Sequence, residues 1–133
     1  MKLIYIAGPI ANPDPKVVKQ NINYACQIAA KYWEQGYSVI CPHANTRSVE
    51  KYTTLNAKDW LQGDFEQLKR CDEIVLIKGW ETSEGSKREL EVATRHGLKV
   101  TFDKSNSLED SLKDKFSIKS LHKERIKDSY NTY

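Results

Sequence analysis

The sequence predicts a doubly wound α/β fold, in which a parallel sheet of four to five strands carries helices on both faces. Two observations lead to this prediction. Four short apolar runs alternate with segments whose apolar residues recur every three or four positions, the period of an α-helix. The first three runs also stop at a glycine or a proline, as buried strands often do. Strands that alternate with helices are typical of parallel sheets.

The N-terminal third supplies the first strand and the first helix. Residues Leu3–Ala7 form an apolar run that ends in a Gly-Pro turn. Asp14 is placed to cap a helix, and Pro15 suits the first helical position. Apolar residues then follow at steps of three and four until Gly36, where we expect the helix to end.

The middle of the chain predicts a second strand, a long loop and a second helix. Tyr37–Cys41 is the strand, because Pro42 interrupts the run that follows Gly36. Residues 43–56 are polar without a clear period, and we expect a loop of the length that often carries function. Asn56 is placed to cap the helix that follows it.

The remaining elements complete the sheet. Glu73–Lys78 holds a continuous apolar run, which indicates a strand buried on both faces. A helix over about residues 85–96 and a fourth strand at Lys99–Phe102 follow. Residues 1–102 thus form one flavodoxin-like or Rossmann-like domain, and we expect residues 103–133 to form a helical extension with a polar, basic tail.

The composition excludes several classes of protein. A net charge of +3 is too small to indicate nucleic-acid binding, and no apolar run approaches the length of a membrane span. The N-terminus lacks the pattern of a signal peptide, so we expect a cytoplasmic protein. Three cysteines without a C-x-x-C pair and three scattered histidines predict free thiols, no metal site and no cofactor.

Two carboxylates and one phenol are the candidate catalytic groups. Glu89 lies about one turn inside the helix that follows a Ser/Gly loop, where backbone amides favour negative charge, so we expect it to be ionised at neutral pH. Asp64 lies at the edge of an apolar helix face, and Tyr5 lies in the first strand. From position alone, two exposed helix carboxylates and a core tyrosine explain the same residues equally well or better.

The candidate binding residues lie where parallel strands end, which is where ligands bind such sheets. Ser83, Gly85 and Ser86 form a small-residue loop at a helix start, which suits an anion but also suits simple capping. The predicted ligand rim consists of Gly8, Pro9, His43, Trp60 and Trp80. The aromatic members could stack on a base, although core packing is the commoner role for such residues.

Four segments occur together in an order that resembles a known family. They are L-I-Y-I-A-G-P-I, D-F-E-Q-L-K-R-C-D, the buried third strand, and G-W-E-T-S-E-G-S-K-R-E-L-E-V-A. Over residues 1–102 they are similar to the nucleoside 2-deoxyribosyltransferase superfamily, which includes the 2′-deoxynucleoside 5′-phosphate N-hydrolases. The closest resemblance is to a branch that is common in bacteriophage genomes.

The resemblance implies both a site and a substrate. Glu89 matches the nucleophile, Asp64 the residue that helps to protonate the departing base, and Tyr5 the residue that positions the nucleophile. Ser83 matches the serine that contacts a 5′-phosphate in the hydrolases, where the transferases carry an aspartate. The implied partner is a small nucleoside or nucleotide rather than a nucleic acid or a membrane, bound by a homodimer or a larger homo-oligomer.

The sequence also departs from the hydrolase pattern. Pro9 and Ala11 stand where the hydrolases carry the serine and arginine that hold phosphate. A phosphate would therefore depend on Arg47, Lys87 or a neighbouring subunit. Alternatives to cleavage of a deoxynucleotide are transfer between free nucleosides, nucleotide binding without turnover, and a flavodoxin-like interaction module that uses the basic tail.

Overall fold

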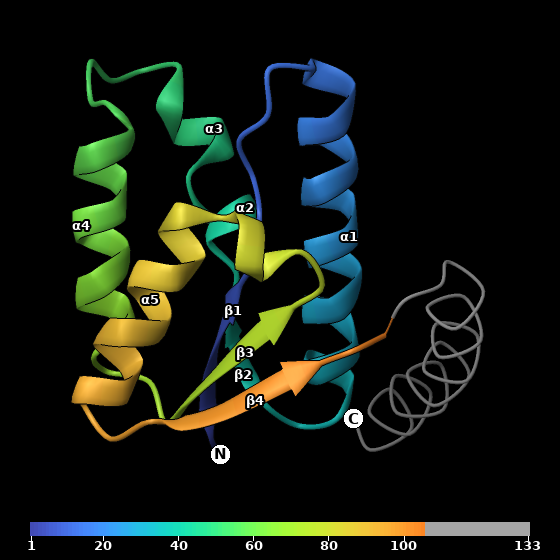
Figure 1. Ribbon diagram of the computed structural model, residues 1–133, viewed down its shortest axis with the longest axis vertical. Helices are drawn as coiled ribbons and strands as arrows, with labels where there is room; N and C mark the ends of the chain where they lie inside the picture. Colours follow the sequence, from blue (N-terminus) through green and yellow to red (C-terminus); the bar gives the residue numbers. More distant parts are fainter. Residues whose placement is uncertain (106–133) are drawn as a thin grey trace, which may run out of the picture.

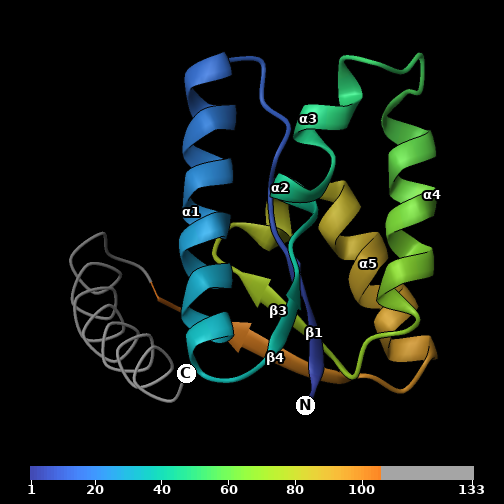
Figure 2. The ribbon, with the colours of Figure 1, turned by 180° about the vertical axis from the view of Figure 1, so that it is seen from behind.

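The structure, a computed structural model, describes residues 1–105. Its four strands are all parallel and stand in the order β2-β1-β3-β4 (Figures 1 and 2). The strands are β1 (Leu3–Ala7), β2 (Ser38–Ile40), β3 (Glu73–Ile77) and β4 (Lys99–Asp103). The chain runs from β1 outward to β2 and then from β3 outward to β4, which is the doubly wound arrangement that the sequence predicts.

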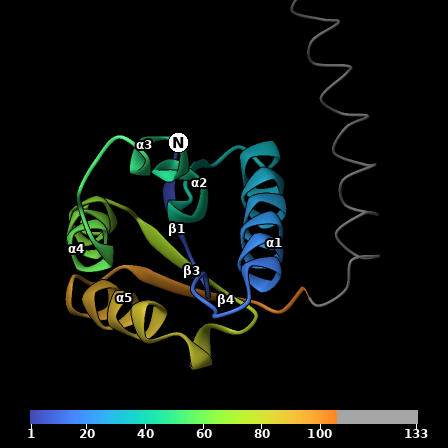
Figure 3. The same cartoon turned by 90° about the horizontal axis from the view of Figure 1, so that it is seen from above.

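Three long helices cover the two faces of this sheet. α1 (Pro15–Glu34) lies on one face, while α4 (Ala57–Leu68) and α5 (Glu84–Arg95) lie on the other (Figure 3). Alternate residues of β1 pack against different helices. Ile4 and Ile6 join the core beneath α1, whereas Tyr5 and Ala7 join the core beneath α4 and α5. This alternation directs Tyr5 toward the two helices that carry the candidate carboxylates.

Each long helix begins at the side-chain cap that its sequence favours. The carboxylate of Asp14 accepts from the backbone N–H of Lys16 at 2.9 Å, and Pro15 occupies the first position of α1. Asn56 and Asp59 form a reciprocal capping box at the start of α4. Gly36, just after α1, has a φ of 95°, which favours glycine. The predicted boundaries of α1 and α4 are therefore confirmed by their caps.

The prediction of an unstructured loop over residues 43–56 is wrong. This segment contains two helices of one turn each, α2 (Pro42–Asn45) and α3 (Arg47–Glu50), and it lies above the ends of β1 and β2. Pro42 opens α2, in which the carbonyl of Cys41 accepts from two backbone amides. Helices of four residues have too few hydrogen bonds to show a sequence period, and tertiary contacts stabilise them.

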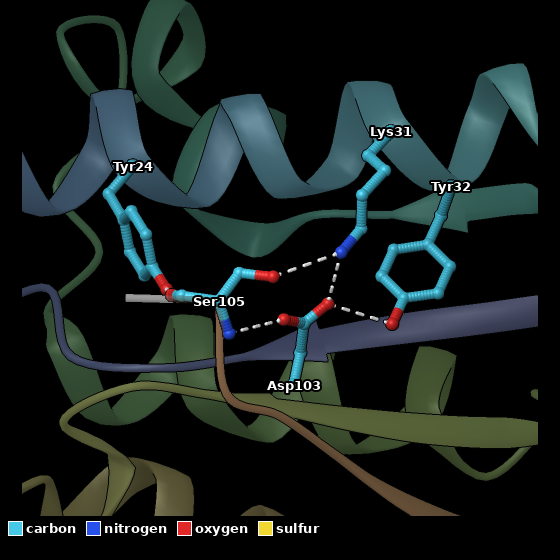
Figure 4. Close-up of polar contacts among 5 residues, drawn as sticks. All are labelled: Tyr24, Lys31, Tyr32, Asp103 and Ser105. Carbon is cyan, nitrogen blue, oxygen red and sulfur yellow. Dashed lines mark hydrogen bonds and ion pairs between the residues drawn. The ribbon is translucent and has the colours of Figure 1, made fainter. Parts of the chain in front are cut away.

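A polar cluster joins the end of β4 to α1 (Figure 4). The buried carboxylate of Asp103 accepts from Lys31 Nζ at 2.7 Å and from the Tyr32 hydroxyl at 2.9 Å. It also accepts from the backbone N–H of Ser105, whose carbonyl accepts from the Tyr24 hydroxyl. Burial alone would raise the pKa of Asp103, but these donors lower it to about 2. The cluster therefore holds the edge strand against α1 through an ionised carboxylate.

The described residues also bear on membrane insertion and on the state of the cysteines. Within residues 1–105, no helix combines the length and the apolar character that a membrane span requires. The three cysteines, Cys26, Cys41 and Cys71, are free thiols. The predicted helical extension and basic tail fall almost entirely within residues 106–133, which lie outside the described residues.

Gly8 lets the chain pass close to β3 just after β1 ends. A Cβ at this position would stand 2.3 Å from Ile77 Cγ1, so β3 leaves no space for a side chain there. We expect Gly8→Ala to lower the free energy of unfolding by ~2 kcal/mol, because the buried neighbours must move. Urea unfolding measures the difference.

Gly63→Ala is the matched control for this substitution. Gly63 lies inside α4, and a Cβ there would meet no atom within 4 Å. This control should raise stability by ~0.5–1 kcal/mol, because alanine favours the helix. Equal effects of the two substitutions would contradict the packing argument.

Candidate active site

A cavity of about 370 Å³ opens where β1 and β2 end. Side chains from α2, α3, α4 and α5 form its walls. Most of the residues that the sequence singles out line it: Gly8, His43, Trp60, Asp64, Ser83, Gly85, Ser86 and Glu89. The volume is in the range of small-molecule sites. The fold thus brings Gly8, just after β1, together with residues of α2, α4 and α5 that are up to 81 positions away in the chain.

Glu89 lines this cavity from the second turn of α5 and is almost completely buried, with 7% of its surface exposed. The fully buried hydroxyl of Tyr5 acts on Glu89 and lowers its pKa, because it favours the charged carboxylate, although the two groups do not meet full hydrogen-bond geometry. Burial nevertheless raises the pKa of Glu89 to about 8, and the charge of Asp64 adds to this effect.

The expectation that Glu89 is ionised at neutral pH is therefore wrong. Desolvation of the carboxylate outweighs the helix start and the tyrosine. Tyr5 responds in the same direction, because burial, followed by the charge of Glu89, raises the pKa of its phenol well above the usual value. Tyr5 is a neutral hydroxyl beside a carboxyl group that holds a proton at pH 7.

Asp64 lines the cavity from the middle of α4 and is half-buried. Burial raises its pKa to about 6. Its charge raises the pKa of both Glu89 and Tyr5, so the three groups lie near one another. Glu89 and Asp64 line the cavity, whereas Tyr5 is fully buried behind its wall and does not line it. Two carboxyl groups with separated pKa values in one cavity are typical of acid–base sites.

The start of α5 forms the side of the cavity that carries hydroxyl groups. Ser83 caps the helix, because its Oγ accepts from the backbone N–H of Ser86 at 3.2 Å. Ser86 is fully buried, and its own hydroxyl has no partner among the described residues. Ser83 and Gly85 also line a neighbouring hollow of about 590 Å³, which Pro9 borders. Capping and ligand binding are thus both compatible with this loop.

His43 belongs to the core of the site rather than to an exposed aromatic rim. Only 2% of its surface is exposed, and its Nε2 lies 3.0 Å from the carbonyl oxygen of Pro9. A carbonyl only accepts, so Nε2 carries the hydrogen. Burial lowers the pKa of His43 to about 4, which leaves the ring neutral. The ring therefore anchors α2 to the turn after β1.

The two tryptophans of the predicted ligand rim, Trp60 and Trp80, lie in different parts of the structure. Trp60 lines the cavity from the first turn of α4. Trp80 does not reach it: its ring packs against Phe102 with centroids 5.5 Å apart, beside a separate hollow at the ends of β3 and β4. The predicted role of Trp80 in substrate binding stays a prediction without support from its position.

Sequence reasoning missed part of the cavity wall. Thr46 and Glu50 line it from the segment that was expected to be a loop, beside Arg47, which the sequence offers only as a possible phosphate ligand. Lys87, the other cation considered for phosphate, is paired with Glu84 at 3.0 Å and is absent from the residues that line the cavity. Only the length of the polar segment indicated a function there, because its short helices lack a period.

A comparison with protein-family models assigns the chain to a family. The model of a family described as a domain of unknown function, DUF4406, matches residues 2–102. The chain belongs to this family. Nearly all of the described part of the DUF4406 chain, including every wall of the cavity, falls within the matched residues. A search of the curated proteins finds no match to it.

Solved structures with a similar fold are nucleoside-modifying enzymes. A 2-deoxyribosyltransferase from Leishmania mexicana is 20% identical, with a TM-score of 0.56, over 80% of the DUF4406 chain and 67% of its own. A 2-deoxyribosyltransferase from Bacillus psychrosaccharolyticus is 19% identical, with a TM-score of 0.57, over 75% and 70% of the two chains. The predicted resemblance is thereby confirmed at the level of the fold.

Metal ligation has no support in the described residues. Within residues 1–105, no group of three or more His, Cys, Asp or Glu side chains is placed to hold a metal ion. The polar groups that face the cavity are carboxyls, hydroxyls, one neutral imidazole and one guanidinium. These groups supply acid–base and nucleophilic chemistry.

Proposed function

We propose that the protein cleaves the N-glycosidic bond of a 2′-deoxynucleoside or its 5′-monophosphate, with Glu89 as the nucleophile. The observation that carries this proposal is the cavity that Glu89 and Asp64 line together, with the buried hydroxyl of Tyr5 acting on Glu89 from behind the wall. The similar fold of two 2-deoxyribosyltransferases supports it. Both structures are named for transfer of the sugar that the proposal places in this cavity.

The chemistry follows from the charge that develops when the bond breaks. As the C1′–N bond lengthens, positive charge grows on C1′, and a carboxylate beneath it stabilises that charge. Glu89 forms a C1′–O bond while the electron pair of the broken bond leaves with the base. Asp64 delivers a proton to the base, which is otherwise a poor leaving group. Water, or a second base, then attacks C1′ and restores Glu89.

The pKa values of Glu89 and Asp64 place the proton where this reaction does not need it. Between pH 6 and 8 the two carboxyl groups hold one proton, and the higher pKa of Glu89 keeps it there. Attack on C1′ requires an ionised Glu89, and departure of the base requires an acid that is still protonated. Growing positive charge at C1′ favours ionisation of Glu89, so the proton moves to Asp64 or the base as the reaction begins. Tyr5 then hydrogen-bonds to the new carboxylate.

The proposal is tested by looking for free base. The full chain is incubated with the four common 2′-deoxynucleosides and their 5′-monophosphates, and the products are separated by chromatography. Base released with a matching amount of free sugar supports hydrolysis, and exchange with an added second base supports transfer. Tight binding of these compounds without base release would overturn cleavage and favour a nucleotide-binding protein.

Asp64→Asn tests the acid in this scheme. We expect kcat to fall ~10²–10³-fold for ordinary bases, because an amide holds no proton to deliver. The loss should be much smaller for 7-methyl-2′-deoxyguanosine, whose base leaves as a neutral molecule without protonation. Base release from both substrates measures the difference.

Glu66→Gln is the matched control for Asp64→Asn. Glu66 lies on the same helix, its side chain is exposed, and it pairs with Lys69 and Arg70 outside the cavity. Its substitution should leave both rates unchanged. An equal loss with both substrates in Asp64→Asn would contradict a role in protonating the base.

A further inference from the structure

Arg47 and Glu50 form an unpaired charged couple on the cavity wall. They lie one turn apart in α3, both are exposed, and both line the cavity. Neither side chain forms an ion pair or a hydrogen bond with another residue of the described range 1–105. The neighbouring helix α2 is anchored, because His43 Nε2 lies 3.0 Å from the carbonyl oxygen of Pro9. A guanidinium and a carboxylate thus face the cavity with their hydrogen bonds unused.

The couple and the start of α5 belong to different parts of the cavity wall. Seen from above, α4 lies between α3 and α5, so α3 is separated from the α5 side of the cavity (Figure 3). The α5 side offers small residues and the hydroxyls of Ser83 and Ser86, which suit a sugar whose C1′ rests on Glu89. The base of the same nucleoside then extends toward Trp60 and α3.

The sign of the charges decides what Arg47 can recognise. A phosphate beside Arg47 would also lie beside Glu50, and the carboxylate would repel it. The edge of a neutral base carries no net charge, so Glu50 does not repel it. A guanidinium donates to a carbonyl oxygen, and a carboxylate accepts from an N–H group. The couple therefore matches a base that presents a carbonyl and an N–H on one edge.

Resting on the proposed function, we infer that Arg47 and Glu50 are the base-recognition residues of this cavity and select an oxo-base. Arg47 donates to the carbonyl oxygen, and Glu50 accepts from the neighbouring ring N–H. Hypoxanthine, guanine and thymine carry this pair of groups. Adenine carries an amino group and an unprotonated ring nitrogen in the same places, so it meets Arg47 with a donor and Glu50 with an acceptor.

The experiment compares 2′-deoxyinosine with 2′-deoxyadenosine, which differ only at these two base positions. Ratios of kcat/KM are measured for the wild type, Arg47→Ala and Glu50→Ala, each with the free nucleosides and with the 5′-monophosphates. We expect the wild type to prefer deoxyinosine and each variant to lose about tenfold of that preference, equally with and without phosphate. Arg95→Ala, which removes an exposed arginine paired with Glu91 at the end of α5, should keep the preference.

The outcomes separate this inference from the function on which it rests. An unchanged preference in both variants overturns base recognition, and so does a loss in Arg47→Ala that is confined to the monophosphates. If the wild type releases base from no substrate, the proposed function fails, and equilibrium binding of the same four compounds decides the inference. A binding preference for deoxyinosine that both variants lose supports it; no preference in the wild type overturns it.

Discussion

Glu89→Gln is expected to lower kcat for base release by on the order of 10⁴-fold or more, a loss typical of removing a covalent nucleophile. The amide keeps the size and the buried position of Glu89 but neither carries negative charge nor forms a stable ester with C1′. KM should change little, because the group acts mainly in the transition state. Chromatographic release of base from the best substrate measures the effect.

Glu91→Gln provides the comparison on the same helix. Glu91 lies two residues further along α5, is exposed, and pairs with Arg95. This variant should retain full activity. Both proteins are first checked for cooperative unfolding, so that a loss of activity reports on the reaction. A Glu89→Gln protein that keeps more than about a tenth of the wild-type rate would exclude Glu89 as the nucleophile.

The same substitution is expected to stabilise the protein, and increasingly so as the pH rises. The pKa of Glu89 is about 8 in the folded chain against 4.5 when solvated, so the folded state holds the proton more tightly. Stability is therefore complete below pH 4.5 and falls as the pH rises toward 8. Glutamine never ionises, so the difference in unfolding free energy between the variant and the wild type should grow by ~4 kcal/mol across this window.

Chemical unfolding at several pH values tests this second expectation. The difference in unfolding free energy between Glu89→Gln and the wild type should widen between pH 5 and 8, because Asp64 and His43 are present in both proteins and largely cancel from it. Glu91→Gln should follow the wild type. A constant difference between Glu89→Gln and the wild type would mean that Glu89 is already ionised at low pH. In that case burial would not be the dominant influence on its carboxyl group.

The sequence was sufficient to predict the fold because its local signals agree with one another. Asp14 and Asn56 cap the helices that their positions indicate, and the apolar run of β3 is buried on both faces as its continuity predicts. The short helices α2 and α3 could not be predicted in this way. They depend on the contact between His43 and Pro9, which are 34 residues apart.

The site was predictable only in part, for a related reason. The position of Glu89 near a helix start gives no sign of its burial, and from position alone an exposed carboxylate is the simpler expectation. The family resemblance selected Glu89, Asp64 and Tyr5, and the fold brings Glu89 and Asp64 to one cavity, with Tyr5 buried next to them. Trp80 looks equally suitable in sequence, yet the direction of the chain after β3 turns it toward Phe102.

The anchoring of His43 has a consequence for kinetic titrations. Histidine is the residue to which an inflection near pH 6 is usually attributed. Here burial lowers the pKa of His43 to about 4, whereas the pKa of Asp64 is about 6. A rate profile that bends near pH 6 would therefore report on the carboxyl group of Asp64 in α4. Its inflection should shift toward higher pH in a solvent of lower polarity, because the ionisation of a carboxylic acid creates charge. The ionisation of an imidazolium creates no net charge, and its inflection should not shift in this direction.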